Sequence, residues 1–85
     1  HAMLELHIEK GPILEAEGKS IGVVTHGQGL WWLVITLTGK DAHTGSTPMN
    51  MRVNAGLGMA RITERVHQIA MSHQPNAVGA VGQVK

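Results

Sequence analysis

Hydrophobic and polar residues alternate along several short stretches of the chain, a pattern typical of β-strands. In residues 3–8 the leucine and isoleucine side chains fall on one face, and the opposite face carries His7 and the neighbouring Glu9. Residues 30–38 alternate in the same way, with Trp32 and Val34 on the face turned away from the core. Residues 21–25 are rich in β-branched side chains, and residues 77–84 also read as a strand. Four strands are therefore predicted, with the middle two paired as an antiparallel hairpin.

A longer period of three and four residues predicts one amphipathic helix over residues 48–72. Thr47 followed by Pro48 is a helix-start signal, and Pro75 requires the helix to end before it. A shorter helical turn is expected over residues 13–17, ended by Gly18. The apolar stripe of the long helix consists of Ala55, Met59, Ile62, Val66 and Ile69. These elements predict an α+β fold, a two-layer sandwich in which an antiparallel sheet is packed by the long helix.

Composition narrows the classes of function. The 85 residues suffice for one small domain, and the net charge of +1, with neither Tyr nor Phe, argues against nucleic-acid binding. The absence of cysteine excludes disulfides and cysteine-based zinc sites, and suits a cytoplasmic protein. The longest apolar run, Leu30 to Ile35, is far shorter than the roughly 20 residues of a membrane span. We therefore expect a soluble protein that does not enter a membrane.

The stretch from Gly39 to Arg52 holds the strongest candidate for chemistry. It joins the best predicted strand to the long helix, and its glycines and short polar residues predict a loop that displays His43. A loop histidine can contact a ligand, although a histidine on a loop is often only solvated. His7 and Glu9 can likewise point two metal ligands to one side of a strand, or can simply form a solvated polar face. No nucleotide-binding glycine motif and no serine-hydrolase motif is present.

Two segments resemble a known family. Residues 5–15, Glu-Leu-His-Ile-Glu-Lys-Gly-Pro-Ile-Leu-Glu, and residues 42–49, Ala-His-Thr-Gly-Ser-Thr-Pro-Met, followed by Arg52, are similar to motifs of di-metal amidohydrolases in the aminoacylase and carboxypeptidase-G clan. The similarity is to the branch of N-carbamoyl-L-amino-acid hydrolases, β-ureidopropionases and allantoate amidohydrolases. Residues 21–24 and 77–84 also look like that branch, so the resemblance covers essentially the whole chain.

The resemblance implies a division of the chain and a set of site residues. Residues 1–18 would be the end of a catalytic-domain strand and a hinge, and residues 19–85 an incomplete ferredoxin-like lid and dimerisation domain. His7 matches a ligand of the two divalent metal ions, which would be Zn, Mn or Co. His43 matches the lid histidine that reaches the substrate in the partner subunit of a homodimer, and Lys10 stands where the family commonly has a substrate-proximal Gln. Asn54 replaces a frequent Asp.

The function implied is hydrolysis of the linear C–N bond of N-carbamoyl-L-amino acids, as part of a longer enzyme, with this chain inactive alone. Residues 29–32, Gly-Leu-Trp-Trp, favour the hydantoin-degrading type. Hydrolysis of allantoate or β-ureidopropionate is the alternative within the family. A non-catalytic self-association module, using the outward face of Trp32, is the alternative outside it.

Overall fold

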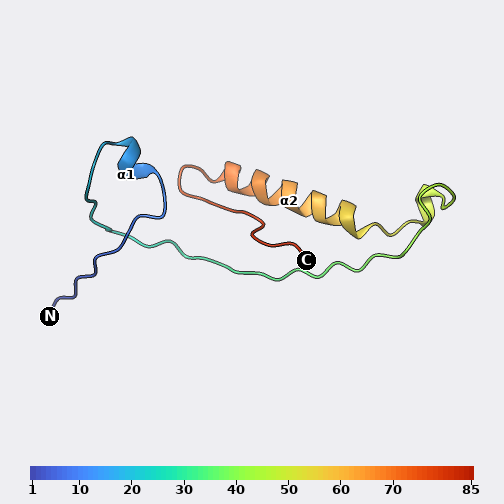
Figure 1. The fold of residues 1–85 in the computed structure, drawn as a ribbon, viewed down its shortest axis with the longest axis horizontal. Helices are drawn as coiled ribbons and strands as arrows, with labels where there is room; N and C mark the ends of the chain where they lie inside the picture. The colour runs from blue at the N-terminus through green and yellow to red at the C-terminus, as the bar shows by residue number, and fades with distance from the viewer. The chain divides into compact units, whose positions relative to one another are not determined.

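The computed structural model describes all 85 residues and contains three helical elements joined by irregular chain (Figure 1). Helix α1 spans Ile13–Ala16, the 3-10 turn η1 spans Met49–Met51, and helix α2 spans Ala55–Ser72. The chain divides into two units, His1–Trp32 and Leu33–Lys85, which are described separately below. None of its helices combines the length and the apolar character that crossing a bilayer requires.

The predicted α+β sandwich is wrong, because the structure contains no β-strand. Residues 3–8, 21–25, 30–38 and 77–84 are all irregular, and no ladder of backbone hydrogen bonds joins any two of them. A strand is held by the amides and carbonyls of a neighbouring strand, so alternation alone cannot form one. The apolar face of a strand also needs a layer to cover it, and here no side chain is buried. Trp32 and Val34 remain 90% and 97% exposed.

In the first unit, α1 is fixed at both ends by local hydrogen bonds. The Glu9 carboxylate accepts from the amides of Ile13 and Leu14 at 3.2 and 3.0 Å, which satisfies two amides that the helix itself leaves free. At the other end Gly18 has a φ of 66°, and the amide of Lys19 donates to the Leu14 carbonyl at 2.8 Å. This is a glycine-terminated helix end, so the predicted turn and its stop at Gly18 are confirmed.

In the second unit, α2 begins later than the sequence pattern predicts. Its N-cap is Asn54, whose side-chain oxygen accepts from the Leu57 amide at 3.0 Å. Pro48 instead precedes the 3-10 turn η1, and Arg52 has an extended backbone with φ −86° and ψ 141°. The predicted start at Pro48 is therefore wrong, because an extended residue interrupts the helical path and Asn54 supplies the cap. The predicted end before Pro75 is correct, since α2 stops at Ser72.

The apolar stripe of α2 is partly shielded by segments of the same unit. After α2 the chain turns back along the helix (Figure 1), and a Cβ built at Gly79 would lie 3.2 Å from Cγ1 of Val66. Near the other end of α2, a Cβ at Gly58 would lie 3.5 Å from Cδ1 of Leu37. The half-buried positions of α2 are Ala55, Gly58, Ile62, Val66 and Ala70. Ala55, Ile62 and Val66 of the predicted stripe are thus half-buried, whereas Met59 and Ile69 are exposed. The helix packs against single chain segments instead of a sheet.

Candidate functional site

The loop that carries His43 is closed at its base by a backbone hydrogen bond. The Lys40 amide donates to the Val53 carbonyl at 2.9 Å, which ties the chain before the loop to the chain just before α2. A Cβ at Gly39 would lie only 2.8 Å from the same carbonyl oxygen, so the close approach of the two segments requires a glycine there. Within the loop, the Thr47 amide donates to the His43 carbonyl at 3.3 Å.

The His43 ring is exposed, and one of its nitrogens is already engaged by the loop. Nδ1 lies 3.0 Å from the Gly45 amide nitrogen and 3.1 Å from the Ser46 amide nitrogen. Both amides are donors, so Nδ1 is the acceptor and carries no proton. In the neutral ring the proton then sits on Nε2. The loop therefore presents His43 as a hydrogen-bond donor through Nε2–H, the form suited to polarising a carbonyl oxygen.

Arg52 donates hydrogen bonds to two carbonyl groups of the loop that carries His43. Its Nε donates to the Thr47 carbonyl at 2.9 Å, and its Nη2 donates to the Thr44 carbonyl at 2.8 Å. The side chain is half-buried. From the sequence, Arg52 was predicted only as part of a motif, without a role of its own. The sequence signal for its hydrogen bonds to the loop was the position of Arg52, shortly after a loop whose carbonyl groups no helix or strand satisfies.

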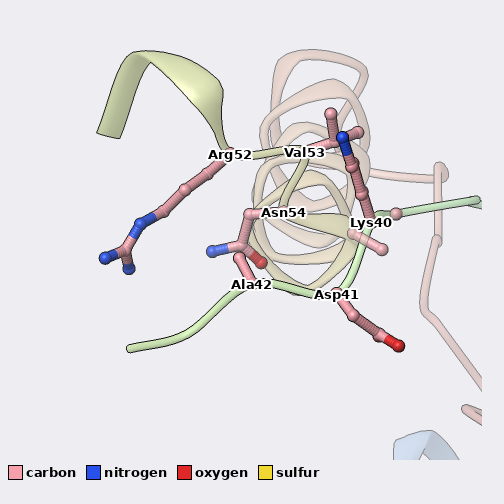
Figure 2. A pocket seen from close by; sticks show the side chains of 8 residues that line it. Lys40, Asp41, Ala42, Arg52, Val53 and Asn54 are labelled. Atoms are coloured by element: carbon pink, nitrogen blue, oxygen red, sulfur yellow. The ribbon is translucent and has the colours of Figure 1, made fainter. Parts of the chain in front are cut away.

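An open depression of about 470 Å³ lies beside the base of the loop (Figure 2). In Figure 2 the side chains of Lys40, Asp41 and Arg52 extend in different directions and do not converge on a common point. His43 is not among the residues that line it. The lining is formed by Gly39, Lys40, Asp41, Ala42, Arg52, Val53, Asn54 and Ala55. The walls of this depression are formed by the base of the loop. No group of polar side chains converges in it on a point where a ligand could bind.

The other predicted site residues, His7 and Lys10, lie in the first unit, whereas His43 lies in the second. His7 Nδ1 lies 2.6 Å from the Ile8 carbonyl oxygen, which can only accept, so Nδ1–H donates and the Nε2 lone pair is available. Metal-ligating histidines commonly have this arrangement. Lys10 is exposed, directly ahead of the turn into α1.

The structure does not assemble a complete metal site from this chain. Glu9, the possible companion of His7, directs both carboxylate oxygens to the amides at the start of α1. No group of three or more histidine, aspartate, glutamate or cysteine side chains is close enough together to hold an ion. His7 thus fits a metal as a single ligand, and a pair of ions would need further ligands beyond those gathered here.

Comparison with known proteins finds that this chain is similar to amidohydrolases, as the motifs indicated. The chain is 73% identical over 84 residues to the N-carbamoyl-L-amino-acid amidohydrolase of Rhizobium meliloti, a match that covers 99% of this chain and 20% of the relative. The corresponding enzyme of Geobacillus stearothermophilus is 39% identical over 83 residues, covering 98% of the chain and 20% of the relative. The allantoate amidohydrolase of Escherichia coli (strain K12) is 44% identical over 61 residues, covering 72% of the chain and 15% of the relative.

These matches confirm the resemblance to the branch of N-carbamoyl-L-amino-acid and allantoate amidohydrolases. The chain corresponds to about a fifth of the length of the N-carbamoyl-L-amino-acid amidohydrolases that it matches. No protein-family model matches it.

Proposed function

We propose that this chain is part of a metal-dependent hydrolase of N-carbamoyl-L-amino acids, in which it supplies His43 to the substrate. The observation that carries the proposal is the hydrogen bonding of the ring: Nδ1 accepts from two backbone amides, so Nε2–H is free to donate. Hydrolysis of a carbamoyl group places negative charge on its carbonyl oxygen as water attacks. A donor already aimed at that oxygen stabilises the charge without reorganising.

The reaction consumes one water and yields the amino acid, carbon dioxide and ammonia. A pair of divalent ions such as Zn, Mn or Co would, when bound, polarise the carbonyl and activate the attacking water. His7 would be one of the ligands, because its Nδ1–H donates to the Ile8 carbonyl and leaves Nε2 for a metal. Lys10, exposed ahead of α1, would contact the substrate. In this chain, His43 then contributes the donor to the developing oxyanion.

We further propose that the active protein is a homodimer, and that His43 acts on the substrate bound in the partner subunit. Its ring is exposed, so it can serve a site formed elsewhere. Trp32 and Val34, which are 90% and 97% exposed, are the side chains that the dimer would cover.

A second candidate is allantoate or β-ureidopropionate hydrolysis, favoured by the 44% identity to an allantoate amidohydrolase over 61 residues. All of these substrates present a carbamoyl-type carbonyl, so the same histidine donor serves each. The three candidate activities are distinguished by comparing kcat/KM of the full-length protein on an N-carbamoyl-L-amino acid, allantoate and β-ureidopropionate. We expect the N-carbamoyl-L-amino acid to give the highest kcat/KM.

The role of His43 is tested by the substitution His43→Ala in the full-length protein that carries this chain. Loss of a single oxyanion donor lowers kcat by roughly 10²- to 10³-fold. Metal content and oligomeric state should not change. His67→Ala is the matched control, since His67 is an exposed residue of α2 distant in sequence from the loop, and it should leave kcat unaltered. Full activity of His43→Ala would reject the catalytic role and favour a chain that serves only self-association.

A further inference from the structure

We propose that Arg52 is a positioning residue for His43, acting through the peptide bond between Thr44 and Gly45. The inference rests on the proposed function of His43 and adds a residue to which that function gives no role. Its basis is a continuous set of hydrogen bonds from the guanidinium group to the imidazole ring.

The hydrogen bond from Arg52 and the hydrogen bond to His43 share one rigid peptide unit. Arg52 Nη2 donates to the Thr44 carbonyl at 2.8 Å, and the Gly45 amide donates to His43 Nδ1 at 3.0 Å. The Thr44 carbonyl and the Gly45 amide belong to the same peptide unit, which is planar and cannot rotate internally. Fixing the carbonyl on one side therefore fixes the direction of the amide on the other. Hydrogen bonds linked through a shared amide also polarise one another in the favourable sense.

A second contact fixes the rotation of the guanidinium group itself. Arg52 Nε donates to the Thr47 carbonyl at 2.9 Å, so the planar fork spans the loop from Thr44 to Thr47. The Gly45 and Ser46 amides that reach His43 Nδ1 lie between these two anchored carbonyls. Arginine suits this task because its donors have a fixed relative geometry, which lysine lacks.

This arrangement assigns Arg52 a different task from substrate binding. Two of its donor nitrogens are already committed to backbone carbonyls, and the side chain is half-buried against the loop. Its loss would let the Thr44–Gly45 peptide rotate. Nδ1 would then lose one of its two amide donors, and the preference of the proton for Nε2 would weaken.

The test compares Arg52→Met, Arg52→Lys and His43→Ala, and combines Arg52→Met with His43→Ala, in the full-length protein. We expect Arg52→Met to lower kcat by about 10²-fold through misplacement of the donor, with KM changed far less. Arg52→Lys retains the charge without the fork and should recover part of the loss. In the double variant kcat should fall no further than in His43→Ala, because both changes remove the same contribution.

A spectroscopic measurement separates positioning from a general structural role. The ¹⁵N chemical shifts of the His43 ring report which nitrogen carries the proton; we expect an Nε2–H ring in the parent protein and a mixture in Arg52→Lys. If Arg52→Met does not fold, this shift and the kcat of Arg52→Lys decide the question. Normal kcat in the Arg52 variants beside an inactive His43→Ala would overturn this inference alone. An active His43→Ala would instead reject the proposed function.

Discussion

The Lys40 amide donates to the Val53 carbonyl at 2.9 Å, and this bond brings the two ends of the His43 loop together. The contact leaves so little room that a Cβ at Gly39 would lie 2.8 Å from the Val53 oxygen and 3.1 Å from the Ala55 amide nitrogen. Both neighbours are backbone atoms and cannot rotate away. The geometry of the loop that displays His43 therefore depends on a glycine at its base.

The substitution Gly39→Val should open the base of the loop. Crowding of this kind costs about 1 kcal/mol or more, which raises the equilibrium constant for opening of the loop base roughly fivefold. Hydrogen–deuterium exchange of the Lys40 amide in the full-length protein measures this opening of the loop base. Gly27→Ala is the control, because nothing lies within 4 Å of a Cβ built at Gly27. Unchanged protection of Lys40 in Gly39→Val would contradict the close approach.

Asn54 gives a second prediction, about the start of α2. Its side chain accepts from the Leu57 amide at 3.0 Å, so Asn54→Ala should cost about 1 kcal/mol of helix stability. Asn54→Asp should preserve the cap and add a favourable charge at the helix N-terminus. Asp at this position, which the resemblance gives as frequent in the family, would act as an equivalent cap. Circular dichroism of synthetic peptides spanning residues 50–76 tests the order Asp, Asn, Ala in helicity; equal helicity of the three peptides would refute the capping role.

The sequence predicted the local features of this chain better than those that depend on distant partners. Gly18 ending α1 and the stop of α2 before Pro75 were correct, because each depends on a residue and its immediate neighbours. The start of α2 was missed because Thr47–Pro48 and Asn54 both carry start signals, and choosing between them requires the conformation of Arg52. The strands were wrong because alternation specifies faces, while pairing requires another segment in register.

In the candidate site, too, only the features set by neighbouring residues could be predicted from the sequence. Loop-forming residues on either side of His43 predicted an irregular connector, and the ring does lie exposed in one. The acceptor role of Nδ1 was not predictable, because it depends on the direction of the Gly45 and Ser46 amides. The role of Arg52 depends on the direction of the Thr44 carbonyl and could not be predicted from the sequence either. Side-chain identity suggests chemistry, whereas the tautomer is set by backbone geometry.

The amide of Gly45 can be tested independently of Arg52 with two substitutions at one position. A Cβ at Gly45 would lie 3.5 Å from His43 Cε1, an ordinary contact, so Gly45→Ala should retain kcat within about threefold. Gly45→Pro removes the N–H that donates to Nδ1 and should lower kcat by roughly tenfold or more. Steady-state kinetics of the full-length protein compares them. Equal kcat values for the alanine and proline variants would show that this hydrogen bond does not hold the ring.

The isolated 85-residue chain should not unfold cooperatively. None of its side chains is buried, and large apolar side chains such as Leu4, Trp31 and Trp32 are more than four-fifths exposed. Without apolar burial, nothing offsets the conformational entropy that a fixed fold loses. Thermal circular dichroism at 222 nm should show a shallow, featureless loss of helix signal. A sigmoidal transition at low protein concentration, in a monomer by sedimentation, would mean that the chain gains a core of its own.

The last prediction concerns His7 and the proposed metals. Its Nδ1–H donates to the Ile8 carbonyl at 2.6 Å, an arrangement that orients Nε2 as a ligand. In the full-length protein, His7→Ala should bind about one metal ion fewer per subunit, because a site that loses one of its few protein ligands holds its ion weakly. Metal analysis by mass spectrometry after dialysis measures the change. His26→Ala is the control, since His26 is an exposed histidine that lies outside the segments that resemble the family's motifs. An unaltered metal stoichiometry in His7→Ala would remove His7 from the ligand set, and would leave the orientation of its ring as a local property of the backbone.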